Sequence, residues 1–256
     1  MNSQSRFWIL IFFFISGATG LIYEVVWTRI LTRVMGNTHY SIATVLTIFM
    51  GGLALGSYLG GRWVDKRKNA LFIYAALEAI IGLYCLLIPS IIESAFPLFE
   101  WIYQTQTESY TQASLYRFFI CGVILILPTS LMGATLPVLS KYVSQDSAFI
   151  GRDVGTLYSL NTFGAVIGAF CSAFLFMKFL GVLATIWFAA ALNIGIAVVI
   201  FIFFKTSSEP PKILERGKET LDKSLFEANT VYILLAFGFS GLCALTYQVA
   251  WNRILS

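Results

Sequence analysis

The sequence predicts an all-α polytopic membrane protein with seven transmembrane helices, arranged as a six-helix bundle and the first helix of a second, parallel repeat. Three observations predict this class. The 256 residues are 58% hydrophobic and only 12% charged, whereas a soluble domain carries about 25% charged residues. The apolar residues form long runs, and one of these runs recurs near the end of the chain. A soluble globular domain, a disordered tail and a secreted disulfide scaffold are thereby excluded.

Charged residues separate seven apolar segments along the chain. The first segment contains only Glu24 and the third only Glu78, and the other five contain no Asp, Glu, Lys or Arg. Each segment is long enough to cross about 30 Å of hydrocarbon as a helix, and none alternates as a barrel strand does. The seven predicted helices cover residues 7–27, 34–61, 69–92, 118–140, 154–177, 179–204 and 228–252.

Basic residues predict the orientation of these helices. With the N-terminus inside, the inside connections contain 12 of the 17 Lys and Arg residues. The outside connection after Ile92 carries Glu93, Glu100 and Glu108 before its first basic residue, Arg117. Basic residues are enriched on the cytoplasmic side of membrane proteins. We therefore expect a cytoplasmic N-terminus in an inner (plasma) membrane, with lipid rather than nucleic acid facing the chain.

An internal repeat predicts the domain organisation. Residues 16–31 align without gaps to residues 240–255, with nine of 16 positions identical, including Tyr23 with Tyr247 and Trp27 with Trp251. Six predicted helices separate the copies, so both enter the membrane from the same side, as in transporters built from parallel repeats. We expect a six-helix bundle over 1–204, a cytoplasmic linker over 205–227 and the first helix of a second unit over 228–256. The sequence is then a piece of a longer protein or a naturally shortened one.

The connection after the second predicted helix resembles the signature loop of the major facilitator superfamily. A glycine is followed after three residues by an acidic residue and then by basic residues, although the glycine usual within the basic run is missing. The matching positions are Gly61, Asp65, Lys66 and Arg67. The resemblance implies a facilitator-like bundle in which Asp65 pairs with a cation or a helix N-terminus and holds an inside gate shut. An ordinary positively charged turn is the alternative.

Glycines spaced four residues apart predict close helix packing. Such spacing produces a smooth ridge along one helix face, against which a neighbouring backbone can approach. The glycines occur in the second and fifth predicted helices, as Gly52, Gly56, Gly60, Gly164 and Gly168.

Two glutamates provide the candidate binding site. A carboxylate inside the bilayer is costly unless it meets a partner, a water-filled cavity, a cation or a proton. Glu24 and Glu78 could each form a cation or proton site, and Tyr23 and Asn161 are further candidate contacts for a cationic solute. The structural alternatives are pairs of Glu24 with Arg29 and Glu78 with Arg117, and helix-to-helix hydrogen bonding by Asn161 and Asn193. The second repeat has Gln248 where the first has Glu24, which leaves Glu24 free to serve a site.

Four segments together resemble bacterial membrane proteins called spermidine-synthase-like, in which a facilitator-like bundle precedes an aminopropyltransferase-like domain. They are the repeated helix around Glu24, Gly-Gly-Leu-Ala-Leu-Gly-Ser at 51–57, Leu-Pro-Thr-Ser-Leu-Met-Gly-Ala-Thr-Leu-Pro at 127–137 and Gly-Thr-Leu-Tyr-Ser-Leu-Asn-Thr-Phe-Gly-Ala at 155–165. The glycine-rich cofactor loop of that synthase domain has no counterpart here. The resemblance therefore carries no catalytic residue to this chain.

Two function hypotheses follow. The first is a transport or binding bundle for a small solute, such as a polyamine or another organic cation. The second is a non-transporting anchor or accessory subunit of a larger membrane assembly. Partners of either form are a second bundle, a soluble synthase-like domain or other membrane subunits. No catalytic residues, metal ligands or cofactor site are expected, because the sequence has no nucleophile–base pair, metal cluster or phosphate loop.

Overall fold

The computed structural model is all-helical and describes residues 3–36, 38–67, 69–105, 110–143, 150–204 and 223–255. Among these residues seven helices are long and apolar enough to cross a membrane, which confirms an all-helical chain with seven candidate spans, while the arrangement as a repeat stays a prediction. In chain order the elements are α1 (Ser3–Met35), α2 (Thr38–Val64), α3 (Ala70–Ser94), α4 (Phe96–Thr105), α5 (Tyr110–Val143), α6 (Ile150–Cys171), the π-helix η2 (Ser172–Phe176), α7 (Met177–Phe179), α8 (Gly181–Phe203) and α9 (Lys223–Leu255).

The structure differs from the sequence prediction mainly where helices end. Helix α1 continues past Arg29 and Arg33, because charged residues at the membrane surface do not interrupt a helix. Helix α4 occupies part of the connection expected to be a loop. The fifth predicted helix divides into α6, η2 and α7, with a π turn at Ser172–Phe176. The expected linker lies mostly outside the described residues, and α9 begins at Lys223 rather than at residue 228.

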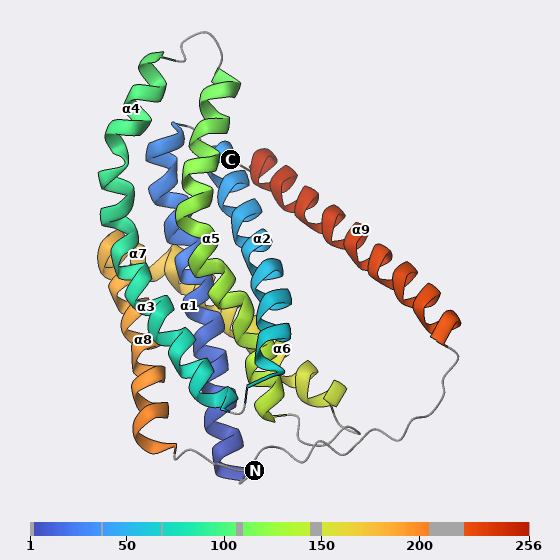
Figure 1. Ribbon diagram of the computed structural model, residues 1–256. Coiled ribbons are helices and arrows are strands. Elements are labelled where there is room, and N and C mark those ends of the chain that lie inside the picture. The colour runs from blue at the N-terminus through green and yellow to red at the C-terminus, as the bar shows by residue number, and fades with distance from the viewer. Residues whose placement is uncertain are drawn as a thin grey trace. The chain divides into compact units, whose positions relative to one another are not determined.

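The chain divides into two compact units, Met1–Pro210 and Pro211–Ser256. In the first unit α2 packs along α5, α1 along α6, and α3 along α8. Figure 1 shows these helices running alongside one another, with α1 near the middle of the bundle. In the second unit α9 is the element that the structure describes.

Glycines allow the closest helix approaches in the first unit. A Cβ atom at Gly56 would collide with the Ser130 carbonyl oxygen, and one at Gly52 with the Thr129 hydroxyl, both on α5. A Cβ atom at Gly60 would lie 2.6 Å from the Ala134 Cβ. On α6, Cβ atoms at Gly164 and Gly168 would collide with the carbonyl oxygens of Phe14 and Ala18 on α1. These backbone contacts hold α2 against α5 and α6 against α1.

Two buried apolar clusters fill the space between the helices. One cluster includes Tyr23 and Trp27, whose rings stack with centroids 5.6 Å apart. The other includes Phe13 and Tyr74, whose rings meet edge to face at 6.3 Å. Since Tyr23 and Tyr74 belong to different clusters, the polar side chains between them lie where the two clusters meet.

Candidate functional site

A buried polar network joins three helices of the first unit around Glu78. The Ser16 hydroxyl of α1 donates a hydrogen bond to Glu78 Oε1 at 2.6 Å, and Asn193 Nδ2 of α8 donates to Glu78 Oε2 at 2.6 Å. Glu78 is fully buried. It is the ninth residue of α3, about 12 Å from the start of that helix at 1.5 Å per residue. A carboxyl group with two hydrogen-bond donors therefore lies deep within the bundle.

Two tyrosines extend this network. The Tyr23 hydroxyl donates to Asn193 Oδ1 at 3.3 Å and lies close enough to interact with the Cys85 thiol. The Tyr74 hydroxyl lies close to Glu78 and Ser16, although it has no hydrogen bond of standard geometry to a described residue. Both tyrosines are fully buried. Ser16, Tyr23, Tyr74, Glu78 and Asn193 thus form one connected cluster, called the Glu78 network below.

Glu24 follows Tyr23 directly on α1 but lies outside the Glu78 network. Its side chain is mostly buried, and its Oε2 atom is inaccessible to solvent and has no hydrogen-bond partner among the described residues. Removing a polar oxygen from solvent without a partner costs about 1–3 kcal/mol, and more for a charged group. Glu24 therefore has a buried carboxylate oxygen that no described residue satisfies.

Asn161 lies on α6, whereas the two glutamates lie on α1 and α3. Its Nδ2 donates to the Phe13 carbonyl oxygen of α1 at 3.0 Å. The Asn161 backbone is so close to α1 that a Cβ atom at Gly17 would collide with the Asn161 carbonyl oxygen. The Asn161 side chain thus fastens α6 to α1, as expected for an asparagine within a membrane bundle.

The structural alternative that pairs Glu78 with Arg117 does not form, because Ser16 and Asn193 donate to the two Glu78 carboxylate oxygens. Arg117 is buried near the start of α5, and its Nη1 donates to the Met35 carbonyl oxygen at 3.4 Å, where α1 ends. Arg29 is exposed, and its expected pair with Glu24 does not form. Sequence spacing alone cannot distinguish such pairs from hydrogen bonds to neutral residues on distant helices.

A lysine organises the connection after α2. Lys141 of α5 donates to the carbonyl oxygens of Val64, Asp65 and Arg67 at 2.6, 2.9 and 2.8 Å. The C-terminal carbonyls of a helix lack intrahelical partners and attract cations. Lys141 therefore fixes the end of α2 and the loop beyond it.

The loop residues themselves point outward. Asp65, Lys66 and Arg67 are exposed, and the Arg67 guanidinium lies over the Trp63 ring, 4.8 Å from its centroid. Gly61 is loosely packed, since a Cβ atom there would lie 3.7 Å from the Pro137 Cβ. The expected gating role of these residues stays a prediction.

Replacing Lys141 with methionine is expected to lower the free energy of unfolding by about 1–3 kcal/mol, because three carbonyl oxygens lose a charged donor. Thermal unfolding of the purified protein in detergent measures the effect. Lys66→Met is the matched control, since Lys66 is exposed in the same loop. Equal stability of the two variants would contradict the role assigned to Lys141.

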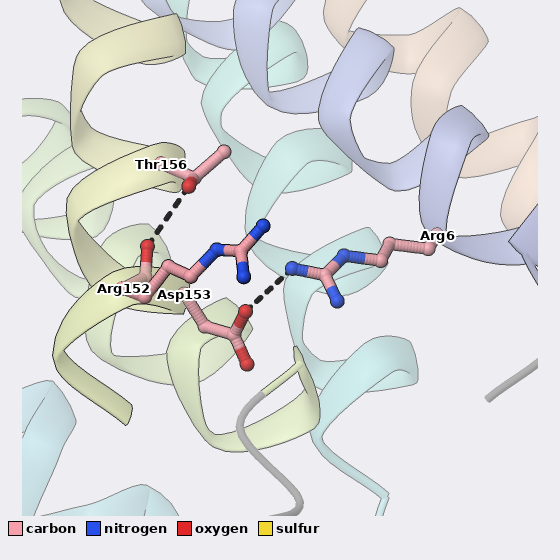
Figure 2. Close-up of polar contacts among 4 residues, drawn as sticks. All are labelled: Arg6, Arg152, Asp153 and Thr156. Carbon is pink, nitrogen blue, oxygen red and sulfur yellow. Dashed lines mark hydrogen bonds and ion pairs between the residues drawn. The ribbon is translucent and has the colours of Figure 1, made fainter. Parts of the chain in front are cut away.

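An ion pair joins the first turns of α1 and α6 (Figure 2). Arg6 Nη2 lies 2.5 Å from Asp153 Oδ1, and the Thr156 hydroxyl donates to the Arg152 carbonyl oxygen at 2.8 Å. Asp153 is buried in the first turn of α6, where the helix dipole stabilises a negative charge. The Arg6 side chain is 43% exposed, so the pair contributes little stability and mainly sets how the two ends meet.

Sequence reasoning missed Ser16 and Lys141 and treated Asn193 only as a helix-bridging residue. A signal for Ser16 was present, since it begins the repeated segment and recurs as Ser240. Lys141 carried no such signal, because a basic residue at the end of an apolar helix is ordinary. Within the part of the chain that the structure describes, no three His, Cys, Asp or Glu side chains gather as metal ligands would.

Comparisons with known proteins give two weak similarities. No family model and no solved structure matches the chain. It is 20% identical over 189 residues to a polyamine aminopropyltransferase of Oceanobacillus iheyensis, covering 73% of this chain and 33% of that protein. It is 22% identical over 202 residues to polyamine aminopropyltransferase 1 of Streptomyces coelicolor, covering 78% of this chain and 35% of that protein. The chain thus spans about a third of the length of the curated relatives it matches, and it is a helical, membrane-type sequence with weak similarity to polyamine aminopropyltransferases.

Proposed function

We propose that the first unit is a membrane-embedded bundle that binds and transports a small organic cation, with polyamines as the substrate class. Six of the seven described helices that are long and apolar enough to cross a membrane lie in this unit and support the location. The names of the two similar proteins support the polyamine class. The two glutamates of the bundle differ in their hydrogen-bond partners.

The observation that carries the proposal is the unpartnered carboxylate oxygen of Glu24. Glu78 already accepts hydrogen bonds from Ser16 and Asn193, whereas Glu24 Oε2 has no partner among the described residues. A carboxylate at membrane depth requires neutralisation by a cation or a proton. Glu24 is therefore the cation contact in this proposal, and Tyr23 and Glu78 hold α1 in position beside it. Asn161 contributes indirectly by fastening α6 to the same helix.

A polyamine suits such a contact chemically. Its ammonium groups pair with carboxylates, and its methylene spacers lose little by leaving water for an apolar bundle. One carboxylate per binding unit neutralises one ammonium group. A second unit would bring Gln248 to the equivalent place, where an amide oxygen accepts a hydrogen bond without adding charge.

Transport by alternating access requires two bundles that rock about a shared midplane site. The repeat supports a second bundle beginning at α9, because the ring stack of Tyr23 and Trp27 recurs as Tyr247 and Trp251, with centroids 6.0 Å apart. In this proposal the organisation is facilitator-like, with the N-terminus in the cytoplasm of a bacterium. The loop of Gly61, Asp65, Lys66 and Arg67 then forms the inside gate, braced by Lys141.

Glu24→Gln is expected to weaken spermidine binding by at least about 30-fold, which corresponds to the loss of about 2 kcal/mol from one buried charge pair. Calorimetric titration of the full-length protein in lipid nanodiscs measures the affinity. Glu100→Gln, the same change at an exposed position on α4, is the matched control and should bind as the wild type does. Unchanged affinity in Glu24→Gln would refute the assignment.

A non-transporting membrane anchor is the second candidate, and one observation favours it. The similar proteins are named for an aminopropyltransferase activity, and this chain matches only about a third of each. The membrane part could then hold a synthase-like domain or another subunit at the bilayer. Accumulation of labelled spermidine in proteoliposomes containing the full-length protein supports transport. Binding without accumulation supports the anchor.

A further inference from the structure

The Glu78 network contains a buried carboxyl group that the proposed cation site does not use. Its neighbours make it a poor cation contact. Both carboxylate oxygens face hydrogen-bond donors, the Ser16 hydroxyl on one and the Asn193 amide on the other. An ammonium group or metal ion at the Glu78 carboxylate would be repelled by the Ser16 O–H and the Asn193 N–H, because both bonds direct positive charge toward the acceptor.

A proton, by contrast, fits this site without displacing any side chain. It adds to Glu78 Oε2 and converts an acceptor into a donor, and an amide can match that change by turning over. Asn193 now directs Nδ2 at Glu78 and Oδ1 at the Tyr23 hydroxyl. After a half-turn of the amide, Oδ1 accepts from the protonated Glu78 and Nδ2 donates to the Tyr23 oxygen. The Ser16 hydrogen bond to Oε1 is kept.

The far end of the network can complete this reversal. Once the Tyr23 oxygen accepts from Asn193, its own hydrogen needs another acceptor, and the Cys85 sulfur lies within interaction range. Cys85 is a free, buried thiol, and a sulfur atom accepts a weak hydrogen bond. Each hydrogen bond in the chain from Glu78 through Asn193 to Tyr23 therefore has a donor and an acceptor in both forms, which matters because an unmatched buried polar group is costly.

We propose that Glu78 is a reversible proton-binding site, and that proton binding reverses the hydrogen bonds running from Glu78 through Asn193 to Tyr23. The step forms one O–H bond on Glu78 with a proton from water and involves no oxidation or reduction. The titratable groups facing Glu78 are Tyr23 from α1 and Tyr74 from its own helix, while α8 contributes the neutral Asn193 and Cys85 faces Tyr23. No Lys, Arg or His of the described chain is among the groups that interact with it.

The consequence for the molecule concerns α1. Tyr23 ends the relay and directly precedes Glu24, so a proton on Glu78 changes the hydrogen bonding of the residue next to the proposed cation contact. The site itself does not rest on that proposed function. It is defined by the contacts among α1, α3 and α8, and it can be tested in a protein that binds no cation.

Infrared difference spectroscopy on the full-length protein in lipid nanodiscs, titrated from alkaline to acid pH, tests the site. The Glu24→Gln background removes the carboxyl group of Glu24, the second glutamate that lies within an apolar run of the described bundle. We expect a protonated-carboxyl band to appear at acid pH, to shift when the protein carries ¹³C-labelled glutamate, and to be lost in Glu24→Gln/Glu78→Gln. The Tyr23 ring modes should change at the same pH.

The variant Asn193→Leu distinguishes a Glu78 carboxyl group that is coupled to Tyr23 through Asn193 from one that titrates without affecting Tyr23. In the same Glu24→Gln background this variant should keep a titrating carboxyl band with a shifted midpoint and lose the accompanying tyrosine change. No labelled-glutamate band at any pH would overturn the proposal, and this readout needs no Glu78 variant to fold. A tyrosine change that persists in Asn193→Leu would overturn the relay.

Discussion

Gly56→Ala is expected to lower the free energy of unfolding by about 1–3 kcal/mol, the typical cost of overpacking. The added methyl group would collide with the Ser130 carbonyl oxygen and lie 2.7 Å from the Ser130 Cα. These are backbone atoms that cannot rotate away, so α2 and α5 must move apart along their length. Unfolding of the purified protein in detergent or bicelles measures the loss.

Gly51→Ala is the matched control on the same helix. A Cβ atom there meets nothing within 4 Å, so the substitution adds no collision and gains the better helix propensity of alanine. Gly164→Ala and Gly155→Ala form an equivalent pair on α6, where only the first would collide with α1. If Gly56→Ala were as stable as Gly51→Ala, the close packing of α2 on α5 would be refuted.

Glu78→Leu is expected to lower the free energy of unfolding by about 2–6 kcal/mol. It leaves the Ser16 hydroxyl and the Asn193 amide without their acceptor, at about 1–3 kcal/mol for each buried group. Adding Asn193→Leu to this variant removes one of the two donors that had lost their acceptor. The double variant Glu78→Leu/Asn193→Leu should therefore be more stable than the sum of the two single changes predicts, since replacing both partners of a buried polar pair by apolar groups is often neutral.

A double-mutant cycle on these two positions gives the coupling free energy directly. Glu93→Leu is a control, because Glu93 is an exposed glutamate on the same helix. Additive effects of Glu78→Leu and Asn193→Leu would show that the two side chains do not interact. Such a result would count against the Glu78 network whatever the protein transports.

The course of the chain through the membrane could be predicted from its sequence because the signal is local. Uncharged runs of membrane-spanning length are helices in a bilayer, where every backbone group must bond within its own segment. Helix α4 escaped prediction because Glu100 and Pro97 interrupt its apolar residues. The π turn at Ser172–Phe176 was not predicted, because none of its five residue types indicates a π turn.

The partners of the site residues could not be predicted for a different reason. Glu78 meets Ser16 and Asn193, which lie 62 and 115 positions away in the chain. Three helices must be oriented before those atoms meet, and one sequence gives no information about their rotation. Residue type predicted that a membrane-embedded glutamate needs a partner, and only the packing of α1, α3 and α8 determined which one.

The π turn at Ser172–Phe176 also affects how this membrane crossing should be aligned with other sequences. A π turn contains one residue more than the α-helical turn it replaces. Deleting one residue there would restore a regular helix without moving either end, so this position tolerates a change of length better than any other point in the crossing. A single-residue gap placed within Ser172–Phe176 is therefore physically reasonable in an alignment, whereas a gap beside Gly164 or Gly168 would rotate the glycine ridge away from α1.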